Sequence, residues 1–151
     1  MKMKKRVFPV LLTSLLTGCG LLGDYTPLPE IGQVSRSQAG FCFQIKNPGD
    51  YYVHFLSIRE RSAPERSGFN REFPALQIAD NQLCIPPSYY HFPDDGEINV
   101  DIALRSPTKK RKYRRDIISE FRVVNGMPIP FAPKEYSVKT DDYIREIESR
   151  S

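Results

Sequence analysis

The amino-acid sequence predicts an all-β protein, a single antiparallel β-sandwich, on three observations. Residues 97–105 alternate strictly between apolar and polar side chains, as a half-buried antiparallel strand does. Turn-forming residues interrupt the chain roughly every 8–12 residues, the spacing expected for a sandwich of short strands. Thirteen prolines are scattered along the 151 residues, and they leave little room for long helices.

The upstream strands follow from the turns between them. Asn47-Pro48-Gly49-Asp50 is a turn sequence, and it separates strands expected at residues 40–45 and 51–59. Residues 76–85 contain two short strands on either side of Asp80-Asn81. We therefore expect four strands before Pro86.

A long hairpin is expected in the second half of the chain. Residues 106–110 connect the alternating strand to a second strand at 111–124. One face of the second strand holds the larger side chains, Tyr113, Ile117, Phe121 and Val123. Asn125-Gly126 predicts a tight turn, and the prolines that follow it allow only an edge strand. Asp95-Gly96 before the alternating strand resembles the start of a late strand in immunoglobulin-like domains, which favours an immunoglobulin-like sandwich.

The two ends of the folded domain have a different composition. Residues 19–33 are rich in glycine and proline and are expected to form a tether, so that the domain spans 34–151. Near the C-terminus, Thr140 is a candidate N-cap, and apolar residues at helical spacing follow it: Tyr143, Ile144 and Ile147. The tail is expected to be a short helix or irregular.

The first 18 residues have the pattern of a secretory signal. Four cations, Lys2, Lys4, Lys5 and Arg6, precede an apolar run at 7–16. This run is too short to cross a bilayer, which takes roughly 20 residues. Without these cations the chain has 18 basic and 18 acidic residues, whereas a nucleic-acid-binding protein is expected to keep a basic surplus. We therefore expect no nucleic-acid partner.

The end of this signal, Leu16-Thr17-Gly18-Cys19, resembles the bacterial lipobox. The resemblance implies that the chain is cut before Cys19 and that Cys19 is triacylated, which meets the requirement for more than one acyl chain in stable anchoring. Gly20 stands where enteric lipoproteins retained at the inner membrane carry Asp, and it favours the periplasmic leaflet of the outer membrane. An ordinary signal with an unrelated cysteine is the alternative.

Two cysteines, Cys42 and Cys84, remain after lipidation, each between large apolar residues. The periplasm is oxidising and permits a disulfide between them, which we expect to connect the two sheets. Closing that loop contributes roughly 4 kcal/mol in the chain-entropy model. Two buried free thiols are the alternative.

No catalytic, metal-binding or cofactor-binding motif is recognised. His54 and His91 lack the neighbouring cysteines or carboxylates of a zinc site. The serines lack a nucleophile-elbow context, and no glycine-rich phosphate loop is present. We expect a protein that is not an enzyme and that uses neither a metal nor a cofactor.

Two surface segments are candidates for binding a partner. The first is a basic segment that can steer an acidic partner, Lys109, Lys110, Arg111, Lys112, Tyr113, Arg114 and Arg115. Its alternatives are a solvated loop or attraction to anionic headgroups beside the anchor. The second is an aromatic segment, since tyrosine is enriched at interface hot spots: Tyr89, Tyr90 and Phe92. Its alternative is packing under a loop.

Several blocks together resemble one family. They are the lipobox, Gly40-Phe41-Cys42-Phe43, the stretch 83–93 and Ala103-Leu104-Arg105. Over about residues 1–131 the chain resembles the small enterobacterial lipoproteins described as type VI secretion immunity periplasmic lipoproteins. The resemblance implies a protein partner, a periplasmic toxin that is bound and neutralised stoichiometrically. An accessory lipoprotein with a structural or assembly role in the envelope is the alternative.

Overall fold

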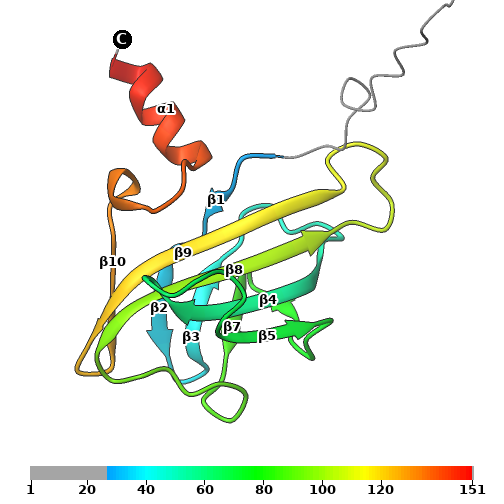
Figure 1. Ribbon diagram of the computed structural model, residues 1–151. Coiled ribbons are helices and arrows are strands. Elements are labelled where there is room, and N and C mark those ends of the chain that lie inside the picture. Colours follow the sequence, from blue (N-terminus) through cyan, green and yellow to red (C-terminus); the bar gives the residue numbers. More distant parts are fainter. Residues whose placement is uncertain (1–26, 151) are drawn as a thin grey trace, which may run out of the picture.

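The alternating strand lies at the centre of the larger of two sheets in a computed structural model, which describes residues 27–150 (Figure 1). The strand order in this sheet is β1-β9-β8-β4-β5, and β10 also pairs with β9. The strands are β1 (Glu30–Ile31), β4 (Tyr52–Glu60), β5 (Phe69–Glu72), β8 (Gly96–Arg105), β9 (Arg114–Val124) and β10 (Met127–Pro130). All pairs except β1–β9 are antiparallel.

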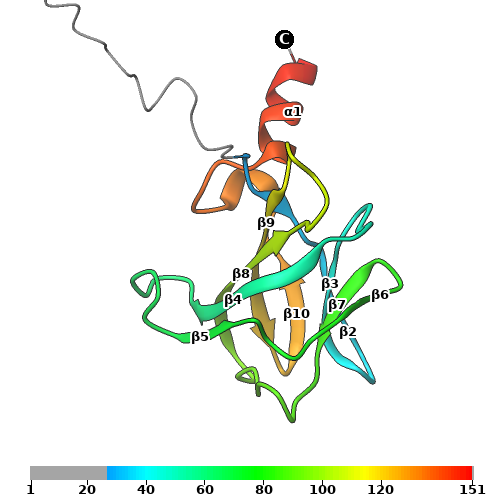
Figure 2. The same cartoon turned by 90° about the vertical axis from the view of Figure 1, so that its right-hand side faces the viewer.

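The smaller sheet is fully antiparallel, with the order β2-β3-β7-β6. Its strands are β2 (Val34–Ser37), β3 (Gly40–Gln44), β6 (Ile78–Ala79) and β7 (Gln82–Ile85). Figure 2 shows this sheet on one side of the molecule and β4, β8 and β9 on the other. The predicted all-β sandwich is confirmed.

The core lies between the two sheets, where the alternation predicted it. The apolar residues of β8 are at most 2% exposed, Ile98, Val100, Ile102 and Leu104. The smaller sheet contributes phenylalanines from β3 that meet rings from other elements. Phe41 stacks on Phe92 with ring centroids 4.4 Å apart, and Phe43 lies 5.9 Å from Phe121. Each such side chain stabilises the fold by roughly 1.5–3 kcal/mol when it is fully buried.

A β-bulge in β4 decides which of its side chains face the core. Val53 pairs with Leu104 and Phe55 pairs with Ala103, so His54 is the extra residue. After the bulge, Leu56 and Ile58 point inward and are fully buried. The alternate residues of β4 therefore lie on the outer face of the larger sheet. The His54 ring is half-buried and packs edge-on against Phe73 at 4.8 Å.

The domain begins earlier than the sequence suggested, which corrects the boundary at residue 34. β1 lies inside the predicted tether and pairs in parallel with β9, with Glu30 opposite Ile117. A two-residue strand is too short to show alternation, so its pairing is visible only in the structure. β9 begins at Arg114 and not at 111, because residues 106–113 form the loop. The predicted signal at 1–18 and the lipidation site Cys19 lie outside the described residues.

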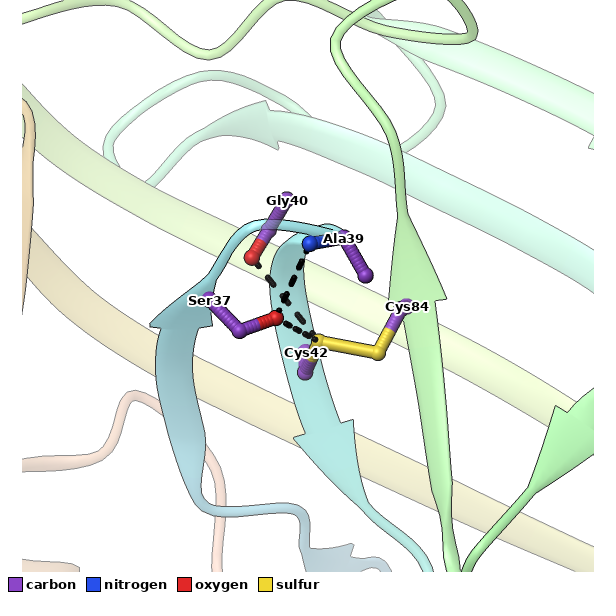
Figure 3. The surroundings of a disulfide bond; sticks show 5 residues. All are labelled: Ser37, Ala39, Gly40, Cys42 and Cys84. Atoms are coloured by element: carbon purple, nitrogen blue, oxygen red, sulfur yellow. Dashed lines mark hydrogen bonds between the residues drawn. A yellow bond between two sulfur atoms is a disulfide. The ribbon is translucent and has the colours of Figure 1, made fainter.

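The disulfide joins Cys42 and Cys84 with a Cα–Cα distance of 4.0 Å, but it does not connect the two sheets (Figure 3). The two cysteines face each other directly across β3 and β7, which are neighbours in the smaller sheet. Phe41 and Phe43 point into the core, so Cys42 between them points to the outer face of this sheet. The Ser37 hydroxyl lies 3.5 Å from Cys42 Sγ. This position corrects the expectation of a link between the sheets.

The C-terminal tail docks on the strand that begins the domain. It contains a 3-10 helix, η1 (Pro133–Glu135), and the helix α1 (Asp141–Arg150). Thr140 is fully buried, and its Oγ1 accepts a hydrogen bond from Tyr143 N at 3.2 Å, which confirms the N-cap. Asp141 N donates to the Pro29 carbonyl oxygen at 2.9 Å. No helix within residues 27–150 is long and apolar enough to span a membrane.

Candidate binding cleft

The outer face of the larger sheet carries a row of polar residues on its three central strands. Period-two alternation places them opposite the core residues. They are Ser57 on β4, Asn99 and Asp101 on β8, and Asp116 and Glu120 on β9. The register puts Ser57 directly opposite Asp101 and Asn99 directly opposite Glu120.

Two segments rise on either side of this face and leave a cleft of about 250 Å³ between them. The first is the loop at residues 61–68, which Arg59 holds in place. The Arg59 guanidinium donates to the carbonyl oxygens of Arg61 at 3.1 Å and Ala63 at 2.7 Å. Gly68 closes the loop, because a Cβ atom there would lie 2.2 Å from the Ile58 carbonyl oxygen. The second is the segment at residues 131–140, which contributes Val138.

One end of the polar row is fully satisfied by hydrogen bonds. Glu120 is completely buried and accepts hydrogen bonds from Asn99 Nδ2 at 3.0 Å and from the Ser137 hydroxyl at 2.7 Å. The Ser137 amide donates to the same carboxylate at 2.6 Å, and Arg61 Nε lies 3.6 Å from it. The Tyr136 hydroxyl accepts a hydrogen bond from Glu120 N at 3.1 Å. Glu120 therefore fixes the segment 131–140 across the sheet.

Asp101, at the other end of the row, has no such partners. Within residues 27–150 no side chain forms a hydrogen bond or an ion pair with it. Burial raises the pKa of the Asp101 carboxyl to about 6, and the carboxylates of Asp116 and Glu65 add to the rise. Arg59 opposes this rise in pKa, but its guanidinium is bonded to backbone carbonyls of the loop.

Two neighbours of Asp101, Ser57 and Asp116, add further hydrogen-bond acceptors to the cleft. Ser57 is 7% exposed, lines the cleft and has no hydrogen-bond partner for its hydroxyl among the described residues. Burial also raises the pKa of Asp116, while Arg114 and Arg105 lower it. Polar groups that are partly removed from water gain when a ligand satisfies them. Arg59 and Arg66 also line the cleft, but the side that holds Ser57, Asp101 and Asp116 is complementary to a ligand group with N–H donors and positive charge, such as an ammonium or a guanidinium group.

A metal ion is not supported by the arrangement of ligands. In the part of the chain that the structure describes, no three His, Cys, Asp or Glu side chains form a group that could hold a metal ion. His91 is exposed, and the half-buried His54 is the bulged residue of β4.

The basic segment of the sequence is divided into two parts by the structure. The side chains of residues 109–112 are exposed at the tip of the β8–β9 hairpin. Arg115 is instead bound within the domain, with two hydrogen bonds of 2.7 Å to the Glu30 carboxylate and one of 2.7 Å to the Lys46 carbonyl oxygen. Tyr113 and Arg114 are half-buried. Only the first four of the seven predicted residues are thus fully available to a partner.

The aromatic segment packs against the core. Phe92 is 7% exposed and lies in the ring stack with Phe41, so its ring is not available to a partner, which corrects that part of the prediction. Tyr89 and Tyr90 are half-buried and contact the Phe69 ring with centroids 5.8 and 5.0 Å away. This is the packing under a loop that the sequence left open as an alternative.

The two predicted surfaces do not come together. The aromatic segment precedes β8 and the basic loop follows it, so they lie at opposite ends of a ten-residue strand (Figure 1). The cleft was not predicted, although the sequence placed Asn99 and Asp101 on the polar face of β8. The sequence did not indicate that residues 61–68 and 131–140 cover part of this face, because neither segment shows a pattern that places it there.

The fold and the cleft define a class of small, two-sheet β-sandwich proteins that carry a polar cleft on the outer face of the larger sheet. A family model described as a domain of unknown function, DUF7480, matches residues 32–126, and the chain belongs to this family. No curated protein and no solved structure matches the chain. The matched range contains both cysteines of the disulfide and the floor of the cleft, and it ends before the segment 131–140.

Proposed function

We propose that this chain is a lipid-anchored periplasmic binding protein, an immunity protein that binds a secreted toxin and neutralises it stoichiometrically. The resemblance over residues 1–131 suggests this class of protein. A stoichiometric inhibitor needs a rigid surface with groups that await a partner. The observation that carries the proposal is the pair formed by Ser57 and Asp101, a buried hydroxyl and a half-buried carboxylate that line the cleft and have no hydrogen-bond partner among the described residues.

The cleft suits a basic side chain of the toxin. An inserted ammonium or guanidinium group would give the Asp101 carboxylate a charged partner, and charge-assisted hydrogen bonds are about twice as strong as neutral ones. Ser57 could accept a further hydrogen bond from the same group. The sheet beneath is held by its ladder, and the rims at 61–68 and 131–140 are fixed by Arg59 and Glu120. A cleft that is ordered before binding loses less entropy when the partner arrives.

The surroundings of the cleft offer enough area for tight binding. Protein inhibitors of this kind use interfaces of about 1,600 Å² in total, which is about 800 Å² on each partner. A single side chain in the cleft would be the centre of such an interface, and the rims would exclude water around it. Desolvated charged anchors of this type are the residues whose loss weakens binding most.

Protection of cells tests this proposal. The full chain is co-expressed with each candidate toxin encoded beside it and exported to the periplasm, and survival is compared with that of cells carrying the cleft variants Asp101→Asn and Ser57→Ala. Asp80→Asn is the matched control, because Asp80 lies in the exposed turn between β6 and β7 and the same charge is removed there. We expect the wild-type chain and Asp80→Asn to protect, and Asp101→Asn to lose protection although it folds.

Two results would contradict parts of the proposal. If the wild-type chain protects against no toxin encoded beside it, the immunity function is wrong and an accessory role in the envelope becomes the better explanation. If Asp101→Asn and Ser57→Ala protect as well as the wild-type chain does, the protein is an immunity protein that uses another surface.

A further inference from the structure

The described chain enters the domain beside the tip of the β8–β9 hairpin. β1 runs parallel to β9 with Glu30 opposite Ile117, so Pro27 lies toward the end of β9 that adjoins the loop. The ion pair of 2.7 Å between Arg115 and Glu30 joins the two segments there. Figures 1 and 2 both show the start of β1 close to this loop. Cys19, the predicted lipidation site, is eight residues before Pro27, a reach of at most roughly 28 Å.

The loop itself is ordered by a network around Asp50. The Ser106 hydroxyl donates to the Asp50 carboxylate at 2.7 Å and accepts a hydrogen bond from Lys109 N at 3.2 Å. Thr108 donates to the same carboxylate through its hydroxyl, and these hydrogen bonds hold the pKa of Asp50 below its usual value. The Tyr51 hydroxyl donates to the Lys112 carbonyl oxygen. The backbone is thus held at both ends of the tip.

Four exposed cations remain on this tip, Lys109, Lys110, Arg111 and Lys112. Lys109 Nζ lies 5.4 Å from the centroid of the Tyr51 ring and interacts with Asp50. Two carboxylates beside the loop are bonded within the domain, Asp50 to loop hydroxyls and Glu30 to Arg115. The helix α1 has four acidic and two basic side chains, and it lies on the other side of β1 from the loop (Figure 1). The tip is therefore a cationic surface beside the point where the described chain enters the domain.

We propose that the tip of the β8–β9 loop, residues 109–112, binds the anionic phospholipid headgroups of the membrane that anchors the protein. This inference rests on the anchor in the proposed function, and not on the toxin. Each Lys or Arg close to an anionic surface strengthens attachment roughly fivefold, so four of them on an ordered loop are sufficient to orient a tethered domain. The hairpin then stands on the membrane, and the cleft opens sideways into the periplasm, where a toxin reaches it.

Limited proteolysis on vesicles tests the inference with the full lipoprotein. The protein is purified with its lipid and reconstituted into vesicles of phosphatidylcholine alone or with added phosphatidylglycerol. Trypsin cleavage within 109–112 is measured by mass spectrometry against cleavage after Arg66, an exposed site on the 61–68 loop of the same molecule. We expect the ratio to fall at least about fivefold on the anionic vesicles and to recover in high salt. An equal ratio on both kinds of vesicle overturns the inference.

Charge variants give a second, independent measurement. Lys110→Gln combined with Arg111→Gln leaves trypsin sites at Lys109 and Lys112, and we expect these sites to lose their protection on anionic vesicles. The matched control is Lys134→Gln combined with Lys139→Gln, which removes two exposed cations outside the tip and should keep the protection. Loss of protection in both variants would show a general charge effect and overturn the inference.

The outcomes separate this inference from the proposed function. The vesicles contain no toxin, so equal ratios leave the immunity function standing. Failure of the protein to remain on phosphatidylcholine vesicles contradicts the lipid anchor itself. If added toxin lowers the absolute rate of cleavage within 109–112 on phosphatidylcholine vesicles and anionic lipid does not, the tip is a protein contact and the membrane inference is wrong.

Discussion

Two carboxylates on the same face of the larger sheet, Glu120 and Asp101, have opposite surroundings. Glu120 is paired with Asn99 and accepts hydrogen bonds from both polar groups of Ser137. Asp101, two residues further along β8 from Asn99, has no side-chain partner within residues 27–150, and burial raises its pKa to about 6. Glu120 is completely buried and has partners supplied by the fold, whereas Asp101 is half-buried in the cleft and has none.

The difference teaches how to separate a structural carboxylate from one that is available for binding. A buried polar group with all of its partners in the same chain stabilises the fold, and its removal leaves those partners unsatisfied. A desolvated carboxylate without partners destabilises the fold in its ionised form. Such a group is a functional-site candidate, because perturbed pKa values cluster where proteins bind or react.

The largest effect is expected when Glu120 is removed. Glu120→Ala should lower the free energy of unfolding by about 3 kcal/mol or more, because Asn99 and Ser137 lose a buried partner and Arg61 loses the buried one of its two carboxylate partners, Glu120 and Glu97. Urea denaturation measures the loss, and hydrogen exchange at the Ser137 amide should become faster. The control is Glu97→Ala, an acid on the same sheet that is 42% exposed and should contribute less than about 1 kcal/mol. Equal losses in the two variants would contradict the structural role of Glu120.

A smaller loss of stability is expected when the disulfide of the smaller sheet is removed. On the outer face of that sheet, the Cys42–Cys84 bond joins β3 to β7. Cys42→Ala combined with Cys84→Ala should lower the free energy of unfolding by about 2–4 kcal/mol, since the open chain gains freedom when it unfolds. Reduction of the wild-type protein should give the same change in denaturant midpoint. Ser37→Ala is the control, as it touches Cys42 and leaves the bond intact. A double variant as stable as the wild type would show that the strand register alone orders this sheet.

The smallest change in stability, and one of opposite sign, is expected at Asp101. Its folded pKa of about 6 lies above the ordinary aspartate value of 3.8, so the folded state binds more protons between these two values and its stability falls as pH rises from about 4 to 6. Asp101→Asn removes the ionised form and should stabilise the domain by about 2 kcal/mol at pH 7.5 and by nearly nothing at pH 3.5. Thermal unfolding at the two pH values measures this difference.

Partner affinity should show the reverse dependence at the same residue. Binding of a cationic group requires the ionised carboxylate, so affinity for the toxin should rise as pH increases through 6 and should lose this dependence in Asp101→Asn. If Asp101→Asn instead destabilises the fold as Glu120→Ala does, then Asp101 is a structural group, and the contrast between the two carboxylates is wrong.

The sequence predicted the parts of the fold that depend on neighbouring residues. β8 was predicted to within one residue, because alternation along one strand is a local pattern. The turn at Asn125-Gly126 was also predicted, and both residues have positive φ in the structure, 51° and 76°. The disulfide was paired correctly but placed between the sheets, because spacing does not show that β3 and β7 are neighbours in one sheet.

The candidate site was less accessible to prediction for the same reason. The polar face of β8 was clear, and Asp101 was on it, but a polar face predicts exposure to solvent. The cover comes from residues 61–68 and from residues 131–140, which lie far from Asp101 in the sequence. Their positions depend on Arg59 and Glu120, whose hydrogen bonds are tertiary contacts. The aromatic segment shows the converse, since Phe92 was a candidate for partner contact, with packing under a loop as the alternative, and it lies in the core.

The sequence by itself determined which residues turn, which alternate, and therefore which side chains of each strand share a face. Only the tertiary structure decided which of the outward carboxylates is satisfied and which is left open. The physical reason is that alternation is set by backbone geometry within one strand, whereas a hydrogen-bond partner such as Ser137 reaches Glu120 only after the chain has crossed the sheet.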